Sequence, residues 1–323
     1  TDNLGNRIQY TLDNMGNRTQ EEIFDPANNI AQRKTREFDA LNRLWKNIGA
    51  QNQTTQYQYD AQGNLKQISD PLQQAINYQF DALNRLTQTI DATNHTTQQQ
   101  YDSLDQISQV TDPKSVATTY NTNGFGDVTQ EISQDRGTTT YTYDSAGNIK
   151  TITDARGVKQ TYTWDALNRP TKRTHTTVTG VPNITALTWN YDNGANGTGR
   201  LTGITDQSGM TTYSYDARGR LLTKTQITKF NTLSFTQSLS YQYDAMGKLQ
   251  QVTYPSGTQI TTTYGADGRP SELRINGNAL ISNITYHPFG EPKSWVWGNG
   301  QAYTRSFDLD GRLKNHPTGS DTR

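Results

Sequence analysis

The sequence predicts an all-β fold in which tandem β-hairpins form one long, curled antiparallel sheet. Three observations carry this prediction: a Tyr-Asp motif that returns about every 21 residues, a second turn between successive copies, and alternating side chains between the turns. Turns arrive about every ten residues and Thr is common between them, which favours strands over helices. Because self-similarity at a fixed period indicates a repeat architecture, residues 1–323 are predicted to form a single array of about fourteen repeats.

The motif is Tyr, Phe or Trp followed by Asp, two variable residues, Gly or Asn, and commonly Arg-Leu. Its Asp recurs at positions 13, 39, 60, 81, 102, 144, 165, 192, 216, 244 and 308, with weaker copies anchored at Asn121, Gly265 and His287. The commonest spacing is 21 residues, and the longer intervals 165–192 and 216–244 contain insertions. We expect these insertions to project from the sheet as loops.

The turn in the motif has the chemistry of a type I turn followed by a left-handed residue. Asp stands at its first corner, and Gly or Asn stands at its fourth. Both tolerate positive φ, so their interchange indicates a backbone requirement and a three-residue hairpin loop with a glycine bulge. The turn residues predicted in this way include Asp60 with Gly63, Asp81 with Asn84, Asp144 with Gly147, and Asp216 with Gly219.

Between the turns, aromatic rings alternate with Thr or Gln, as in residues 56–59 and 140–143, which places the rings on one face of a strand. In the returning strands, apolar residues such as Leu65 and Ile68 are three apart, so we expect a β-bulge or a loose strand end there. About 28 strands result. Because open sheets rarely exceed about ten strands without curling or splitting, the sheet is expected to form a spiral or tube. A sandwich of two sheets satisfies the same pattern.

Composition excludes several classes of protein. Only 31% of the residues are apolar, but zero net charge and 18 regularly spaced Tyr residues argue against disorder. Thirty basic and thirty acidic residues are interspersed, so no basic field is available for nucleic acid. No apolar run reaches the roughly 20 residues of a membrane span. The absence of Cys excludes disulfides and thiolate metal sites.

Two kinds of turn alternate along the chain, and this alternation resembles a known family of repeats. Tyr-Asp-x-x-Gly-Arg-Leu turns alternate with Asp-Pro turns, as at 25–28 and 70–73, and residues 286–300 are similar to a stretch of bacterial Rhs cores. The pattern resembles the YD repeats of the Rhs family, of teneurins, and of shell-forming subunits of insecticidal toxin complexes. The resemblance implies a hollow β-sheet shell that often encloses a C-terminal toxin, in a bacterial protein that is secreted or on the cell surface. The self-cleaving Asp-Pro-x-Gly-Leu-x-Gly motif of such cores is not matched, since residue 73 is Gln.

The expected function is therefore a structural shell or wall segment, not an enzyme, and without a cofactor. The chain begins at Thr1 in mid-repeat and without an initiator Met, so we expect a fragment of a longer protein with no toxin domain of its own. Its expected partners are the remainder of that protein and an enclosed toxin domain. Unpaired end strands near Tyr10 and Phe307 are expected to promote self-association.

Two other functions compete with the wall. A carbohydrate-binding adhesion module is the stronger alternative, and Trp295 and Trp297, on one face of the same strand, are its candidate sugar-stacking residues. A polysaccharide-active enzyme is the weaker one, because nearly every Asp is explained by a turn. Asp308 and Asp310 resemble the start of a calcium loop, but no acidic residue closes it, so they are assigned to turn capping. The four histidines have no metal-ligand spacing and are expected at the surface: His95, His175, His287 and His316.

Overall fold

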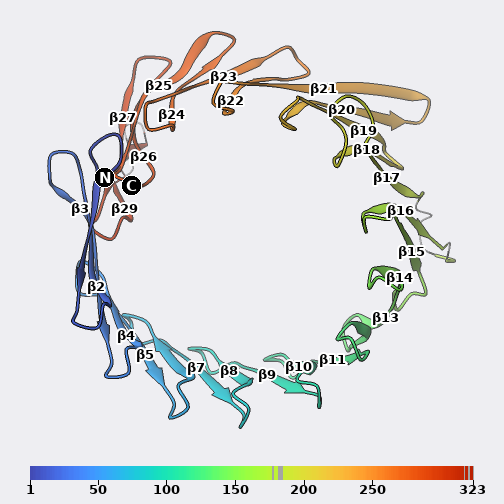
Figure 1. The fold of residues 1–323 in the computed structure, drawn as a ribbon, viewed down its shortest axis with the longest axis horizontal. Coiled ribbons are helices and arrows are strands. Elements are labelled where there is room, and N and C mark those ends of the chain that lie inside the picture. Colours follow the sequence, from blue (N-terminus) through green and yellow to red (C-terminus); the bar gives the residue numbers. More distant parts are fainter. Residues whose placement is uncertain (177, 181–184, 316, 319–320, 323) are drawn as a thin grey trace. The chain divides into compact units, whose positions relative to one another are not determined.

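The computed structural model describes residues 1–176, 178–180, 185–315, 317–318 and 321–322, so the prediction for His316 lies outside the described part. Strands and turns make up this part, without a helix, and therefore without a helix that could cross a membrane. Strands β1 to β27 belong to one antiparallel sheet. Strands that follow each other in the chain, such as β2 and β3 or β13 and β14, lie side by side in it (Figure 1). The all-β fold class, with tandem hairpins in a long antiparallel sheet, is confirmed, and the described strands do not form the two-sheet sandwich.

The strands have these bounds: β1 (Arg7–Leu12), β2 (Arg18–Phe24), β3 (Ile30–Phe38), β4 (Leu44–Ile48), β5 (Thr54–Tyr59), β6 (Leu65–Ser69), β7 (Ala75–Phe80), β8 (Leu86–Ile90), β9 (Thr96–Tyr101), β10 (Ile107–Thr111), β11 (Ala117–Thr122), β12 (Val128–Ser133), β13 (Gly137–Tyr143), β14 (Ile149–Thr153), β15 (Lys159–Trp164), β16 (Pro170–His175), β17 (Leu187–Tyr191), β18 (Leu201–Asp206), β19 (Gly209–Tyr215), β20 (Leu221–Phe230), β21 (Leu233–Tyr243), β22 (Leu249–Thr253), β23 (Gln259–Tyr264), β24 (Pro270–Ile275), β25 (Asn278–Tyr286), β26 (Pro292–Trp297), β27 (Ala302–Thr304), β28 (Ser306–Phe307), β29 (Leu313–Asn315), β30 (Pro317–Thr318) and β31 (Asp321–Thr322).

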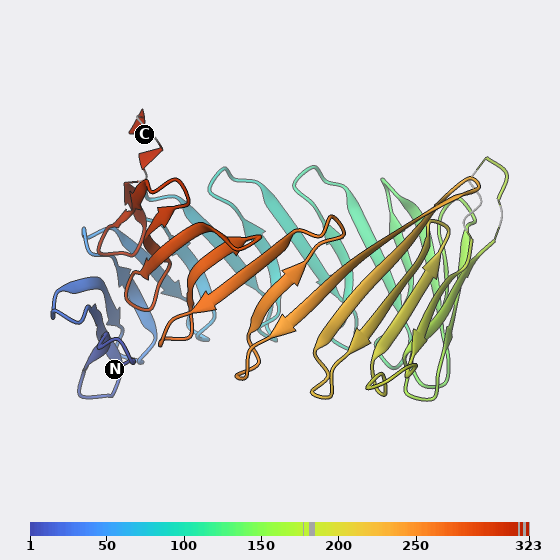
Figure 2. The same cartoon turned by 90° about the horizontal axis from the view of Figure 1, so that it is seen from above.

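The chain divides into two compact units. Unit 1 consists of Thr1–Asn94, Tyr243–Gln251 and Thr258–Arg323, and unit 2 consists of His95–Gln242 and Val252–Gly257. Both units are built from the same antiparallel hairpins, whose strands and tight turns are visible from a second direction in Figure 2.

The turn of the motif has the predicted geometry. In the turn that follows β5, Gly63 N–H donates to Asp60 O over 3.2 Å, and Asp60 N–H donates to Asn64 O over 2.9 Å. Gly63 has a φ of 94°, and Asn84, Gly147 and Gly219 have φ values of 62°, 82° and 78° at the same place. One turn differs from the prediction, because the left-handed φ of 53° falls on Phe289 and not on the following Gly290.

The β-bulge predicted for the returning strands is present. Tyr59 pairs with Leu65, but Gln58 pairs with Gln67, so one extra residue is accommodated in β6. This extra residue brings Leu65 and Ile68 to the face that carries the rings of Tyr57 and Tyr59. The same irregularity follows the motif turn in other hairpins, including β7–β8, β13–β14 and β19–β20.

Two features of the repeat pattern were assigned wrongly from the sequence. The first concerns the weak copy of the motif assigned to Asn121. Its turn begins at Asn123 instead, because Asn123 N–H donates to Asp127 O over 2.9 Å. Both neighbouring intervals, from Asp102 and to Asp144, then become 21 residues.

The second correction concerns the insertion in 216–244, which is not a loop. It lengthens two strands into the hairpin β20–β21, which pairs continuously from Thr223–Ser240 to Phe230–Leu233 (Figure 1). The insertion in 165–192 includes residues outside the described part of the chain.

The fold buries few hydrophobic side chains. Among the described residues, the buried hydrophobic side chains are Ile23, Phe24, Val158 and Trp295, and no large side chain is completely enclosed. Most rings are half-buried against their neighbours along the sheet. Packing therefore runs from strand to strand, which makes the contacts between repeats the main source of order.

Candidate functional site

The aromatic residue of the motif is bonded to the preceding repeat. The Tyr59 hydroxyl donates to Leu44 O, 15 residues earlier, over 2.9 Å. In each such bond the acceptor begins the returning strand of the preceding hairpin. Equivalent bonds run from Tyr143 to Val128 O (2.7 Å), from Trp164 Nε1 to Ile149 O (2.8 Å), from Tyr215 to Leu201 O (2.6 Å), from Tyr264 to Leu249 O (2.7 Å) and from Tyr286 to Pro270 O (2.7 Å).

The basic residue of the motif links its own turn to the next ring. Arg43 Nη2 lies 2.7 Å from Asp39 Oδ2, and the same guanidinium lies over the ring of Tyr59, 4.3 Å from its centroid. A guanidinium held by a carboxylate on one side and a π-face on the other couples two repeats. Similar cation–ring contacts join Arg169 to Tyr191 (4.3 Å), Arg269 to Tyr286 (4.1 Å) and Lys248 to Tyr264 (5.0 Å).

The motif aspartates act as turn caps. Asp60 Oδ1 accepts the N–H groups of Gln62 and Asn64 over 3.0 and 2.8 Å, and the Asn64 side chain donates to Oδ2 over 3.0 Å. This side-chain hydrogen bond holds the pKa of Asp60 below its ordinary value. Hydrogen bonds from Arg85, Asn148 and Arg220 lower the pKa values of Asp81, Asp144 and Asp216 respectively. Such carboxylates stay ionised near neutral pH, which suits acceptors of hydrogen bonds and not general acids.

Neighbouring motif turns also touch each other through side chains. Asn64 Nδ2 donates to Asn84 Oδ1 over 2.8 Å, and Asn148 Nδ2 donates to Asn168 Oδ1 over the same distance. These amides belong to successive repeats, so each bond joins two neighbouring turns, one pair in each unit.

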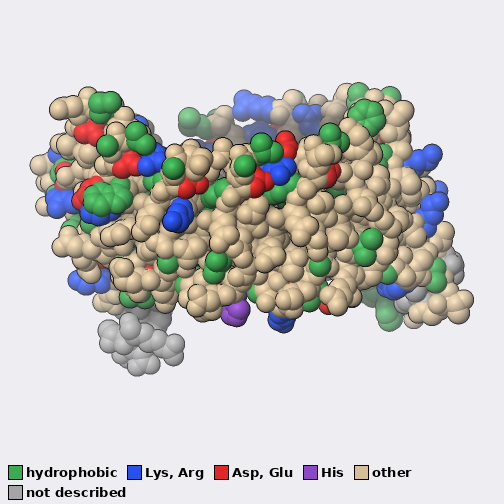
Figure 3. All heavy atoms as spheres, turned by 90° about the horizontal axis from the view of Figure 1, so that it is seen from below, with side chains coloured by type: hydrophobic (Ala, Val, Ile, Leu, Met, Phe, Trp, Pro, Cys, Tyr) green, Lys and Arg blue, Asp and Glu red, His purple; other side chains and the backbone are tan. Residues whose placement is uncertain are grey.

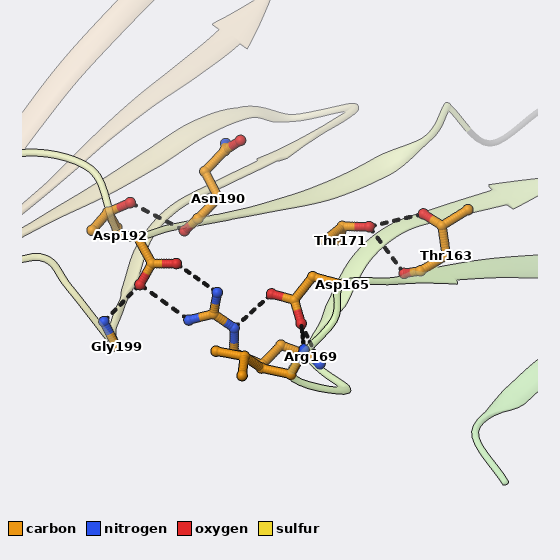
Figure 4. A network of polar contacts seen from close by, with 9 residues as sticks. Thr163, Asp165, Arg169, Thr171, Asn190, Asp192 and Gly199 are labelled. Atoms are coloured by element: carbon orange, nitrogen blue, oxygen red, sulfur yellow. Dashed lines mark hydrogen bonds and ion pairs between the residues drawn. The ribbon is translucent and has the colours of Figure 1, made fainter. Parts of the chain in front are cut away.

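A charged version of this link lies in unit 2 (Figure 4). Arg169 donates to Asp165 Oδ2 over 2.7 Å and to both carboxylate oxygens of Asp192, at 2.5 and 3.1 Å. The same Asp192 accepts the N–H of Gly199 over 2.6 Å, inside a wider turn. The Arg169 bond lowers the pKa of Asp192. Arg169 therefore bridges two repeats.

Shallow grooves lie between neighbouring turns. One groove of about 640 Å³ runs between residues 123–129 and 141–147, and includes Phe125 and Tyr141. Another of about 610 Å³ includes Arg169 and Trp189. Because the two grooves fall at corresponding places in the repeat, we interpret them as products of the repeat and not as one specific site. The face in Figure 3 likewise carries basic and acidic side chains interspersed.

Trp295 and Trp297 do share one face of β26, with ring centroids 5.6 Å apart. Trp295 is only 9% exposed, because it stacks on Tyr303 at 4.3 Å and Arg305 lies 4.8 Å from its centroid. Trp297 is 39% exposed. Only one of the two rings is thus open to a sugar, and the carbohydrate-binding alternative stays a prediction without a specific observation in its favour.

The remaining candidate residues differ in their surroundings. His95 is exposed, as expected, but His287 is only 7% exposed, so its predicted surface position is wrong. The ring of Phe307 lies 4.9 Å from that of His287, and burial lowers the pKa of His287. Asp308 caps its own turn through the N–H groups of Asp310 and Arg312, both over 2.9 Å. The sequence did not indicate the burial of His287, because Phe307, which packs against its ring, is 20 positions away.

Comparisons with known proteins agree with this geometry. The family model of the teneurin YD-shell matches residues 3–180, and that of the RHS repeat matches residues 196–231. Double-stranded DNA deaminase toxin A of Burkholderia cenocepacia (strain H111) is 31% identical over 121 residues, which are 37% of this chain and 8% of that toxin.

Solved structures share the fold. TcdB2-TccC3 without its hypervariable C-terminal region superposes with a TM-score of 0.81 at 16% identity, covering 99% of this chain and 19% of that one. A Tc holotoxin pore of Photorhabdus luminescens gives 0.79 at 16% identity, covering 95% and 18%. The chain therefore spans less than a fifth of each of these relatives. Since the first family model covers more than half of its residues, the chain belongs to the teneurin YD-shell family.

Proposed function

We propose that this chain is a wall segment of a hollow shell, with which a longer polypeptide encloses a toxin domain or presents a surface domain. The observation that carries the proposal is the bond from the motif aromatic residue to the preceding repeat, as from Tyr59 to Leu44 O. Together with the strand ladders and the bridging arginines, it joins each repeat to the next without a second layer. A sheet one layer thick with both faces open is suited to separating an inside from an outside.

The printed names of two relatives support the enclosed cargo. One of them is a DNA deaminase toxin by name, and another is described without a hypervariable C-terminal region. A constant wall combined with a variable C-terminal segment is consistent with a container whose contents change. On this proposal the wall residues contribute structure and no catalysis, and the protein is secreted or displayed on a bacterial surface.

The test measures whether the segment that follows the repeats is shielded. A recognition site for a site-specific protease is placed in a flexible stretch after the repeats in the longer polypeptide. We expect cleavage of the folded protein to be at least about tenfold slower than cleavage of the same protein in urea, where the wall is open and the protease remains active. Equal rates in the two states would contradict enclosure.

A further inference from the structure

Within unit 1, the hairpin β28–β29 contacts strands from the other end of the chain. Leu309 O accepts the N–H of Arg33 in β3 over 2.8 Å. Asp310 Oδ1 accepts the N–H of Ala50, 260 residues away, also over 2.8 Å. Figure 1 shows β29 beside β3, in agreement with these bonds. The turn of this hairpin therefore contacts both a strand and a turn of the N-terminal repeats.

The turn at Gly49 lacks the capping carboxylate that sister turns have at Asp25, Asp70 and Asp112. In the corresponding turn at Asp70, the Asp70 Oδ1 accepts the N–H groups of Leu72 and Gln74 over 2.9 and 2.8 Å. Gly49 has no side chain to do this. The N–H of Gln51 instead meets Gln53 Oε1 over 2.9 Å, and the N–H of Ala50 meets Asp310.

The Gln53 amide completes the arrangement, because its nitrogen donates to Asp310 Oδ2. Asp310 thus places a carboxylate at a turn whose first residue has none, and it binds the Ala50 N–H and the Gln53 side chain. Its charge is matched by Arg312, whose Nη2 lies 2.7 Å from Oδ2. The side chain of Asp310 is only 13% exposed.

The shapes of the two turns are complementary. A Cβ on Gly49 would lie 2.7 Å from Asp310 Oδ1 and would overlap the side chain of Gln53. An Asp at this position, as in the turn at Asp70, therefore requires the side chains of Gln53 and Asp310 to move away. Residues at the place that Asp310 occupies in its own turn point outward in other repeats, where Leu41, Leu83 and Phe125 are 71%, 64% and 94% exposed.

We propose that residues 306–312 and the turn 49–53 form a latch that holds two distant parts of the wall together. The latch is a point contact and not a strand ladder. The β3–β4 ladder ends at the pair Thr35–Ile48. Two residues earlier in β3, the N–H of Arg33 donates to Leu309 O, which is a single main-chain hydrogen bond. In unit 1, β3 and β4 are joined by four paired residues and β4 and β5 by three, so the latch is the junction that opens first among them. This inference does not depend on an enclosed toxin.

Spin labels can report on the latch, because the natural chain has no Cys. Cysteines at the exposed positions Gln51 and Lys314 would carry the labels, and pulsed dipolar spectroscopy would measure the distance between them. In the otherwise unchanged chain we expect one narrow distance distribution. A broad distribution in this chain would overturn the proposal.

Two variants open the latch by different routes. Asp310→Ala removes the carboxylate, and Gly49→Asp gives the N-terminal turn its own carboxylate while blocking the docked one. Both should broaden the distribution and shift it to longer distances. The exposed Asp135 provides a matched control, since Asp135→Ala removes a carboxylate elsewhere and should leave the distribution unchanged.

The two variants also separate latch opening from misfolding. Gly49→Asp leaves the sequence of β28–β29 intact, so broadening in this variant cannot come from loss of that hairpin's own contacts. Amide exchange provides an independent readout, because the N–H of Ala50 should exchange faster in Asp310→Ala while the amides of β13 and β14 keep their rates. An unchanged narrow distribution in both variants would show that Asp310 does not hold the junction.

Discussion

The hydroxyl of Tyr59 donates a hydrogen bond to the main-chain carbonyl of Leu44 over 2.9 Å. The two residues belong to successive repeats, and the Arg43 that precedes Leu44 covers the ring of the same tyrosine. The Tyr, Arg and Leu of the motif are therefore used together, across a repeat boundary. The hydroxyl gives Tyr a link to the preceding repeat that Phe, at the same place before Asp39, Asp81 and Asp308, cannot make.

The first prediction concerns this bond. Tyr143→Phe removes the hydroxyl that donates to Val128 O over 2.7 Å and leaves the carbonyl without that donor. We expect the free energy of unfolding to fall by about 1 kcal/mol. Urea titration followed by intrinsic fluorescence measures this change. Tyr57→Phe is the control, because its hydroxyl forms no hydrogen bond among the described residues, and an equal loss in both variants would contradict the assignment.

The second prediction concerns the left-handed turn position. Gly147 has a φ of 82°, and a Cβ there would meet nothing within 4 Å, so only the backbone conformation limits substitution. Gly147→Val should lower the free energy of unfolding by about 1–3 kcal/mol, because a β-branched residue is strained at positive φ. Gly147→Asn should cost much less, since Asn84 and Asn168 occupy the same place with φ values of 62° and 58°. Thermal unfolding would decide, and equal shifts for Val and Asn would contradict it.

The third prediction is acid sensitivity. The motif carboxyls have pKa values below the ordinary 3.8 in the folded chain because hydrogen bonds favour their ionised form. A lowered folded pKa means that stabilisation is fully present above the ordinary value and is lost as the pH falls through the folded value. The contribution of these carboxyls to the urea midpoint should therefore stay level down to about pH 5 and fall below about pH 4. In Asp81→Asn, which keeps an acceptor oxygen without the charge, the fall should be shallower.

The fourth prediction separates His287 from the carboxyls. Burial lowers its pKa below 6.5, so the unfolded chain binds a proton at a higher pH than the folded chain does. The stabilisation is present above about pH 6.5 and decreases as the pH falls below it. The variant His287→Asn places a turn-forming residue there, as at Asn123, and should remove this step from the stability profile. A step that persists in the variant would assign it to another group.

The fifth prediction distinguishes packing from sugar binding in β26. Trp295 is buried against Tyr303, so Trp295→Ala should lower the free energy of unfolding by about 3 kcal/mol or more. Trp297→Ala should have a much smaller effect, because its ring is 39% exposed. A glycan array with the intact chain and both variants tests the alternative. Saccharide binding that is lost in both variants without a change in stability would favour the adhesion function.

Local chemistry determined much of this fold. The left-handed places at Gly63 and Asn84, the capping role of Asp60 and the bulge between Leu65 and Ile68 were all predicted, because each depends on a few adjacent residues. A repeat amplifies such signals, since the same requirement is visible many times.

Where the sequence offered two similar local solutions, the prediction was wrong. Asn121 and Asn123 both follow Tyr120 within three residues, and the choice between them depends on how β11 pairs with β12. The insertion in 216–244 was expected to be a loop, but its residues continue the ladder between β20 and β21. Which residues of two strands pair with each other depends on contacts between the strands, and a local sequence pattern does not specify them.

The sequence by itself determined the repeat, the turn type and the face that carries the rings. Only the tertiary structure decided which residues meet over long separations: Tyr303 on Trp295, Phe307 on His287, and Asp310 at Gly49. The physical reason is that turns and alternation are set by the backbone preferences of neighbouring residues. The burial of a ring or the placement of a distant carboxylate depends instead on how the sheet brings remote strands together. The absence of a side chain at Gly49 is explained only by the tertiary structure, in which Asp310 lies beside it.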